Sequence, residues 1–269
     1  MTISPLLLAA DPEMFTKDSN NVITSVAGML GCDKWNKLKV SDGVNLQEDN
    51  VLVEFDIAPC DSFAGFNKLL KEGIEASRKI IHPFGFEIAE GISSHIYSEA
   101  EIASFHESVL EFGCVPDYNG LTGIPNPRPQ AVNSGLRSAG GHIHFGFSGD
   151  VEVSTQTQAK MTIMCDMFLG LTSLLIDDDN RRRELYGQAG SIRYKDYGIE
   201  YRSLSNFWIF EEAKRKWAYD QATKAFSAMK NEDQFFELVS ILNPREVQRV
   251  INEDDKAMAE SYIILAKVM

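Results

Sequence analysis

The chain has 269 residues, of which 44% are hydrophobic and 24% are charged, an ordinary balance for a globular protein with a sizeable core. Its formal net charge is -13 and it has no long basic run, which argues against nucleic-acid binding because an acidic surface repels a phosphate backbone. A small nucleotide is not excluded, since a few arginines or divalent cations reverse the field inside a cleft.

The cysteines and the N-terminus indicate an intracellular chain without a membrane segment. The first ten residues contain a short apolar run that no basic residue precedes and that meets the charged Asp11 and Glu13. This run is too short to span a membrane and lacks signal-peptide flanks, so we expect it to be the first strand. The cysteines form no CxxC pair, which favours reduced thiols in a cytoplasmic compartment. They are Cys32, Cys60, Cys114 and Cys165.

The first eighty residues predict strands followed by one helix. Leu6 to Phe15 reads as a strand, and Val22 to Val26 returns after a turn-rich segment. Val51 to Ile57 alternates, with four apolar residues on one face and Leu52, Glu54 and Asp56 on the other, as a half-buried strand does. Phe63 to Ile81 fits an amphipathic helix that ends near His82-Pro83, because the residue before a proline disfavours the helical conformation.

The middle of the chain predicts a strand, a helix, a loop and a second strand. Phe84 to Tyr97 reads as a strand region, and Ser98 with Glu101 resembles a capping box for a helix that reaches about Phe112. The segment Gly113 to Pro129 is rich in proline and glycine, and we expect a long functional loop. Gly140 to Phe147 reads as a strand.

The last part of the chain predicts mostly helix. Ser154 to Ile176 has helical spacing, and Asp177 to Lys195 reads as a polar, arginine-rich connection into a strand from Gly198 to Leu204. From Glu211 to Met269 the pattern is helical, with a break at Asn243-Pro244. We therefore expect an α+β catalytic domain over residues 1–210 and a helical C-terminal segment over residues 211–269 that packs on it.

Two histidines form the first candidate site. His142 and His144 are two residues apart on the predicted strand, so both imidazoles point to one face while Ile143 and Phe145 point to a core. The glycines of the surrounding segment Gly140 to Phe147 leave room for a close approach to the backbone. Two solvent-facing histidines on an exposed sheet are the alternative interpretation.

Acidic residues occur in pairs on the same face of two predicted strands. Asp11 shares a face with Glu13, and Glu54 shares a face with Asp56. Neighbouring carboxylates repel each other, and hard divalent cations are a reason to keep them together. Pro12 lacks a backbone N–H and predicts an edge strand or a bulge. For either pair alone, a solvated strand face is the simpler explanation.

A third group combines a carboxylate with guanidinium groups. Glu200 and Arg202 share a strand face after an arginine-rich connection that contains Arg181 to Arg183 and Arg193. A metal-holding carboxylate beside a phosphate-holding guanidinium suits phosphoryl transfer, whereas a surface ion pair is the common alternative. The chain contains neither a GxSxG nor a GxxxxGK[ST] motif, which argues against a P-loop nucleotide site.

Five segments of the chain, taken in their order along the sequence, resemble one protein family. The segments DPE, VEFD, FGCVPDYN, AGGHIHFG and YGQAGSIRYKDYGIEYRSLSNFW are similar to those of the glutamine synthetase and glutamate–cysteine ligase superfamily of carboxylate–amine ligases. The likeness is closest to the compact COOH–NH2 ligases of tailed phages, the type 2 group. It runs from about Leu6 to Phe210, and five motifs in one order are more specific than any of them alone.

The resemblance implies a curved antiparallel sheet, a half-barrel backed by helices, that binds ATP at one end of its concave face and substrate at the other. His142 would bind a metal shared with ATP, and His144 would lie close to the phosphates. The implied metal ligands are Asp11, Glu13, Glu54, His142 and Glu200. The implied nucleotide-binding residues are His144, Arg193, Lys195 and Arg202, and the implied catalytic residues are Arg193, Glu200 and Arg202. Asp56 and Arg137 have no counterpart.

These expectations combine into an ATP- and Mg²⁺-dependent ligase that forms an amide through an acyl phosphate. The expected ions are two or more Mg²⁺, with Mn²⁺ as an alternative. The expected partners are a carboxylate and an amine, each a small molecule or a peptide, and neither nucleic acid nor membrane. The expected location is the cytoplasm, that of the host if a phage encodes the chain. Substrate identity and oligomeric state do not follow from the sequence.

Two other functions are compatible with parts of the pattern. A zinc-dependent hydrolase would use His142, His144 and a carboxylate, because imidazole and carboxylate ligands suit zinc as well. The arginine-rich approach to Glu200 argues against it, since a simple zinc hydrolase does not need those charges. A non-catalytic binding protein on the same scaffold is the third candidate.

Overall fold

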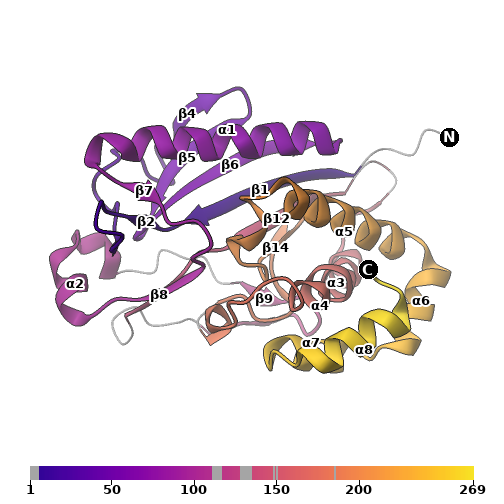
Figure 1. The fold of residues 1–269 in the computed structure, drawn as a ribbon. Helices are drawn as coiled ribbons and strands as arrows, with labels where there is room; N and C mark the ends of the chain where they lie inside the picture. Colours follow the sequence, from indigo (N-terminus) through magenta and orange to yellow (C-terminus); the bar gives the residue numbers. More distant parts are fainter. Residues whose placement is uncertain (1–5, 111–116, 128–134, 148, 150, 185) are drawn as a thin grey trace.

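The computed structural model describes residues 6–110, 117–127, 135–147, 149, 151–184 and 186–269. In this part of the chain, the largest element is a nine-stranded sheet with only antiparallel neighbours, which does not close into a barrel (Figure 1). The predicted α+β class with a large antiparallel sheet is confirmed. In spatial order its strands are β10 (Ile124–Pro125), β9 (Tyr118–Asn119), β13 (Ser191–Lys195), β14 (Gly198–Tyr201), β12 (Gly141–Gly146), β1 (Leu7–Met14), β6 (Leu52–Cys60), β5 (Val44–Asp49) and β4 (Leu38–Ser41).

Helices cover one face of this sheet. The helix α1 (Phe63–Ile81) lies along β5 and β6, and α3 (Thr155–Cys165) packs against β13 and β14 (Figure 1). The helix α5 (Glu212–Lys230) joins the two, because it contacts both α1 and α3. The opposite face of the same strands lines a cavity, so alternate side chains of each strand serve the core and the cavity.

The sequence of α1 explains its position and both of its ends. Ser62 caps the first turn by accepting a hydrogen bond from the backbone N–H of Gly65 at 3.4 Å. Phe66, Leu70 and Ile74 recur at helical spacing and are buried against the sheet, at about 1.5–3 kcal/mol for each side chain. The predicted helix from Phe63 to Ile81 is confirmed at both ends.

One hydrophobic core fills the space between the helices and the sheet. It contains Phe55 and Phe145 from the strands and Trp208, whose ring stacks on Phe66 at 5.9 Å between centroids. Cys165 is also buried in it, and Cys32, Cys60 and Cys165 are free thiols, while Cys114 lies outside the described residues.

The C-terminal residues form four helices. They are α5, α6 (Glu232–Ile241), α7 (Pro244–Asn252) and α8 (Lys256–Ala266). The predicted break at Asn243-Pro244 is confirmed, and Asn243 caps α7 by accepting from the N–H of Arg245 at 2.9 Å. A second break lies at Asn231, which caps α6 in the same way. The helices α7 and α8 pack against η4 (Asp166–Gly170) and α4 (Leu171–Ser173), which continue the chain after α3.

The region from Phe84 to Tyr97 is less regular than predicted. After the short turn η1 (His82–Phe84), it contains β7 (Glu87–Ile88) and β8 (Ser94–Ile96), separated by a turn at Gly91, whose φ is 79°. The two pieces belong to different small sheets. One consists of β3 (Ile23–Thr24), β2 (Thr16–Lys17) and β7, and the other of β11 (Leu136–Ser138) and β8.

The helix predicted to reach Phe112 is shorter. The capping box of Ser98 and Glu101 is present, but α2 (Glu99–Ser104) ends where Phe105 adopts an extended conformation. The Phe105 ring packs edge-on against Tyr97, with 5.2 Å between centroids, so tertiary packing interrupts the helix. A short 3-10 helix, η2 (Glu107–Leu110), follows.

Two predicted connections contain strands. Within the segment Gly113 to Pro129, β9 and β10 form a hairpin at the sheet edge, and residues 113–116 and 128–129 lie outside the described part. The connection from Asp177 to Lys195 contains a short 3-10 helix, η5 (Arg181–Glu184), and ends in β13, which pairs with β14 across a two-residue turn. On β13 the polar side chains of Arg193 and Lys195 face the cavity, and they hid the alternation of this strand in the sequence.

The sequence predicted that Pro12 lies on an edge strand or at a bulge, but the strand that contains it is not at the edge of the sheet. Pro12 lies within β1, opposite Gly141 of β12, and β6 pairs with the other side of β1. A single missing N–H is tolerated because neighbouring bonds hold the strand, including the one from Glu13 N to Gly140 O at 2.9 Å. The register with β6 shifts between Leu8 and Ala10, earlier in the strand.

Candidate active site

A cavity of about 600 Å³ lies on the face of the sheet that the helices leave free. This volume is in the range of about 300–1,000 Å³ that holds small molecules. All nine site residues predicted from the sequence line it: eight lie on the five strands β1, β6, β12, β13 and β14, and Arg202 directly follows β14. They are Asp11, Glu13, Glu54, His142, His144, Arg193, Lys195, Glu200 and Arg202.

Asp11 lines the cavity and contacts both histidines. Residues of β1 and β12 are paired so that Asp11 lies opposite His142. Its Oδ1 is 3.3 Å from Nδ1 of His142 and 3.2 Å from Nε2 of His144. Burial by itself would raise the pKa of Asp11, but His144 and His142 together lower this pKa well below its ordinary value.

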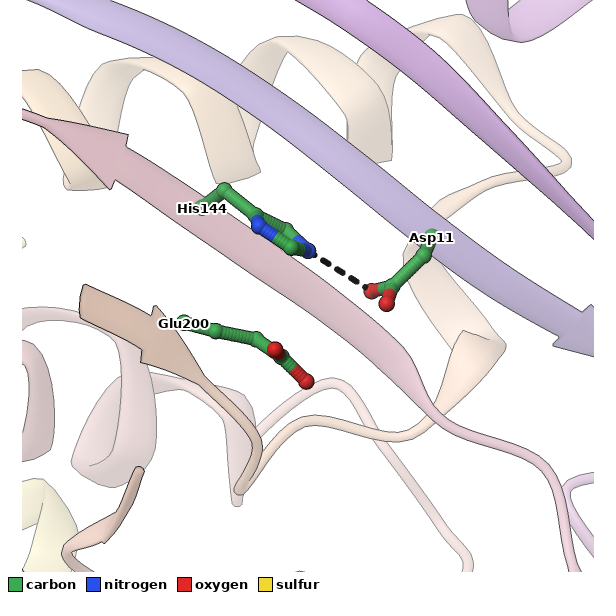
Figure 2. Close-up of side chains that lie close together, drawn as sticks. All are labelled: Asp11, His144 and Glu200. Carbon is green, nitrogen blue, oxygen red and sulfur yellow. Dashed lines mark ion pairs between the residues drawn. The ribbon is translucent and has the colours of Figure 1, made fainter. Parts of the chain in front are cut away.

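Asp11, His144 and Glu200 form a group that could hold a metal ion. One ligand atom from each lies within 4.8 Å of the other two, and the three side chains come from β1, β12 and β14 (Figure 2). Asp11 Oδ1, His144 Nε2 and Glu200 Oε2 are buried and make ion-pair contacts but no hydrogen bond of good geometry. Buried acceptor atoms left in this way are what a bound cation would satisfy.

Glu200 also faces three cationic side chains. Its carboxylate forms an ion pair with Arg202, with Arg193 at 3.2 Å and with Lys195 at 2.8 Å. Burial and the charge of Asp11 act to raise the pKa of Glu200, but Arg202 and Arg193 outweigh them and lower it to about 2. The site therefore combines a carboxylate ligand with a cluster of cations that could bind phosphate oxygens.

His142 lies deeper and contacts two guanidinium groups. Its Nδ1 is 3.3 Å from Nη1 of Arg202, and its Nε2 is 3.4 Å from Nη2 of Arg182. Burial and the charge of Arg202 lower the pKa of His142 to about 4, so its imidazole is neutral at pH 7. A Cβ on Gly140 would lie 2.2 Å from His142 Nε2, so this glycine makes room for the protein's own imidazole.

Three further carboxylates form an acidic region beside this centre. Glu13 and Glu54 lie opposite each other on β1 and β6, and Asp49 of β5 also lines the cavity. Burial and the charge of Asp49 raise the pKa of Glu13 to about 7, and the same two causes raise the pKa of Glu54 well above its ordinary value. Each makes one short hydrogen bond, Glu13 from Gly140 N at 2.6 Å and Glu54 from Gln47 Nε2 at 2.5 Å.

Several cavity residues were not predicted. Gln47 and Asp49 lie on β5, and the buried Val44 and Leu46 that alternate with them are a signal that could have revealed this strand. Lys34 and Lys37 reach the cavity from the segment before β4, where the sequence has no periodicity that would place them.

The other charged residues that the sequence analysis considered lie in different places relative to the cavity. Asp56 lines the cavity and pairs with Lys37 at 2.7 Å. Arg137 is buried elsewhere, where it donates to Asn50 Oδ1 at 3.0 Å and to Val109 O at 2.9 Å. Of the three consecutive arginines, Arg182 is buried behind the cavity and donates to the carbonyls of Arg202 and Ser203.

A comparison with known protein families finds one family model that matches a central segment of the chain. Residues 134–237 match the family model described as phage phiEco32-like COOH.NH2 ligase-type 2. The predicted resemblance to COOH–NH2 ligases of type 2 is confirmed. No curated protein matches the chain. The segment that matches the ligase model contains β12, β13 and β14, and hence His144, Arg193 and Glu200.

The carboxylates of β1 and β6 precede the segment that matches the COOH–NH2 ligase model. The sheet joins them to that segment, because β1 pairs with β12 on one side and with β6 on the other. Within the described residues, no helix combines the length and the apolar character that crossing a membrane would require.

Proposed function

We propose that this protein is an ATP- and Mg²⁺-dependent carboxylate–amine ligase that forms an amide through an acyl phosphate. The observation that carries the proposal is the position of Glu200, which completes a group of metal-ligand type with Asp11 and His144 and also pairs with Arg193, Lys195 and Arg202. A metal-binding group beside a cluster of cations is what transfer of a phosphoryl group requires. The match to the ligase family supports the reaction class.

The residues present fit a divalent cation. Asp11 and Glu200 supply carboxylate oxygens, which suit Mg²⁺ or Mn²⁺, and His144 adds a nitrogen that transition-metal ions favour. Glu13 and Glu54 supply further carboxylates for a second ion in the neighbouring acidic region. A bound ion would hold the nucleotide and screen the negative charge of its phosphates. The geometry favours His144 as the imidazole ligand, because His142 contacts two guanidinium groups.

The cationic side chains stabilise the reacting phosphoryl group in this proposal. Arg193, Lys195 and Arg202 are held in place by Glu200, so they are oriented before the substrate binds. A carboxylate substrate attacks the terminal phosphate of ATP, its C–O–P bond forms, and ADP leaves. The amine then attacks the activated carbonyl, which releases phosphate and a proton and leaves an amide. ATP is needed because a carboxylate is a poor electrophile in water.

The proposal also covers the fold family, the substrates and the cellular location. The nine-stranded sheet, with helices on one face and the cavity on the other, would be the half-barrel of a glutamine synthetase-like fold. The substrates would be a carboxylate and an amine, each a small molecule or a peptide. The reaction would take place in the cytoplasm, that of the host if a phage encodes the chain.

A ligation assay tests this function. Purified protein is incubated with ATP, Mg²⁺ and a panel of carboxylates labelled with ¹⁸O in the carboxyl group, with and without a panel of amines. We expect amine-dependent release of ADP and the transfer of one ¹⁸O atom from the carboxylate to the released phosphate. Failure of every pair to react, together with the absence of ATP binding by calorimetry, would refute the proposal.

A zinc-dependent hydrolase is the second candidate, because one histidine and two carboxylates with an open position also suit a catalytic zinc ion. Metal analysis of the purified protein separates the two. Stoichiometric zinc that survives dialysis, with hydrolysis of an amide or ester substrate in the absence of ATP, would favour the hydrolase.

A further inference from the structure

Tyr197 contacts the imidazole that faces the candidate metal group. Its hydroxyl oxygen lies 2.6 Å from Nδ1 of His144, and the two rings are nearly parallel, at 25° with 6.2 Å between centroids. The other nitrogen of His144, Nε2, faces Asp11 Oδ1 at 3.2 Å. The imidazole of His144 is therefore held between a phenol and a carboxylate.

The turn that carries Tyr197 is fixed by the rest of the fold. Tyr197 lies between β13 and β14, and its carbonyl accepts a hydrogen bond from the N–H of Phe147 at 2.8 Å. From α3, the side-chain amide of Gln158 donates to the carbonyls of Lys195 at 3.0 Å and Gly198 at 2.8 Å, and so joins both sides of the turn. Gly198 has φ of 148°, and a Cβ there would lie 2.1 Å from the carbonyl oxygen of Phe145.

The chemistry of imidazole gives this contact a consequence. A neutral imidazole carries its proton on one nitrogen only, and the nitrogen that binds a metal must be the one without it. If Nε2 of His144 is to face a cation beside Asp11 and Glu200, the proton has to reside on Nδ1 and needs an acceptor there. The hydroxyl oxygen of Tyr197 is within hydrogen-bond distance of Nδ1 and can accept.

We propose that Tyr197 is a positioning residue that holds His144 in the tautomer with a proton on Nδ1 and with Nε2 directed at a divalent cation. The inference rests on the part of the proposed function that puts a cation at Asp11, His144 and Glu200. It does not depend on the nature of the substrates or on amide formation.

Titration with Mn²⁺ alone, followed by electron paramagnetic resonance of the free ion, tests the proposal. The variant Tyr197→Phe removes the hydroxyl and keeps the ring. We expect its affinity for Mn²⁺ to fall about 10-fold, the lower end of the effect known for groups that orient metal ligands. The control is Tyr194→Phe on β13, whose ring packs against Tyr118 at 5.3 Å between centroids and does not line the cavity. It is expected to bind Mn²⁺ like the wild type.

A second measurement distinguishes orientation from a general structural effect. Long-range ¹H–¹⁵N correlation of the histidine side chains in the Mg²⁺-bound protein is expected to show a protonated Nδ1 and an unprotonated Nε2 for His144. Without Mg²⁺, where no cation fixes the proton, the neutral imidazole of the wild type is expected to keep it on Nδ1, whereas in Tyr197→Phe the two tautomers are expected to be mixed, at an unfolding temperature close to that of the wild type.

The outcomes separate this inference from the proposed function. Equal Mn²⁺ affinity of wild type and Tyr197→Phe would overturn the role of Tyr197, whatever the protein catalyses. A wild type that does not bind Mn²⁺ would overturn both the metal site and this inference. A wild type that binds Mn²⁺ with the expected loss in the variant, but does not ligate any substrate, would uphold the inference and count against the ligase.

Discussion

Single residues at this site have several partners at once. Glu200 is buried among Arg193, Lys195 and Arg202, and it also completes the group with Asp11 and His144. The sequence predicted that Glu200 and Arg202 share a face, because residues two apart on a strand do so. It could not predict Lys195 beside Glu200, because this contact depends on how β13 pairs with β14.

Replacing Glu200 tests the proposed catalytic role directly. The variant Glu200→Gln keeps the shape but loses the negative charge, so the three cations lose their common partner and the metal group loses an oxygen ligand. We expect ADP release to fall about 100-fold or more, as when one preorganised charge is removed from an active site.

The control for this prediction is Glu232→Gln, because Glu232 pairs with Lys160 at the surface and its side chain is 74% exposed. That variant is expected to turn over at the wild-type rate, since a surface ion pair contributes about 0–1 kcal/mol. Near-normal turnover in Glu200→Gln would contradict its role.

At the scale of elements, apolar periodicity was sufficient for some helices and strands. It predicted α1 to the residue and the strand with both histidines, because each buries a regular apolar stripe. It failed where tertiary packing interrupts a pattern. Thus α2 ends at Phe105, and the long helix after Ser154 contains a π-helical turn at Asp166 to Gly170. Such a turn leaves no trace in the apolar spacing.

The close contact of α1 with the sheet predicts a destabilised variant. A Cβ on Gly73 would lie 2.2 Å from Cδ2 of Phe55, so Gly73→Ala overpacks this contact and is expected to lower the free energy of unfolding by about 1–3 kcal/mol. This loss exceeds the gain of about 1 kcal/mol that alanine brings to a helix. Urea denaturation measures the difference, with the exposed Glu75→Ala on the same helix as the control. An unfolding free energy of Gly73→Ala equal to that of the wild type would show that the contact is loose.

The π-helical turn predicts a pH-dependent contribution to stability. Asp166 accepts hydrogen bonds from Tyr201 and Gly190, both at 2.8 Å, and from Gln248 at 2.9 Å, and burial raises its pKa from 3.8 to about 6. Because the folded state binds this proton more tightly, the stabilisation that the proton gives is complete below pH 4 and is lost as the pH rises through 6. The change amounts to about 3 kcal/mol for a shift of about two pKa units.

The variant Asp166→Asn does not titrate in this range. The unfolding free energy of the wild type minus that of Asp166→Asn is therefore expected to fall between pH 4 and pH 7. The control is Asp42→Asn, a change at a fully exposed side chain, compared with the wild type in the same way. If the difference in unfolding free energy between the wild type and Asp166→Asn does not change with pH, the pKa of Asp166 is not raised in the folded protein.

At the scale of the whole molecule, the site is assembled by strand order rather than by sequence neighbours. Asp11, His144 and Glu200 lie on β1, β12 and β14, which are adjacent in the sheet although far apart in the chain. Alternation within each strand predicted which side chains share a face. The strand order, and with it the choice of His144 rather than His142 for the metal group, could not be predicted because it depends on long-range pairing.

The central claim is that one cavity binds ATP through a divalent cation held by Asp11, His144 and Glu200. Calorimetric titration with a non-hydrolysable ATP analogue tests this claim most directly. We predict one site per chain, with binding that is strong in the presence of Mg²⁺, weak when the metal is chelated, and insensitive to Mg²⁺ in the variant Asp11→Asn. Binding of the analogue with the same affinity with and without Mg²⁺ in the wild type, or no binding at all, would contradict the account.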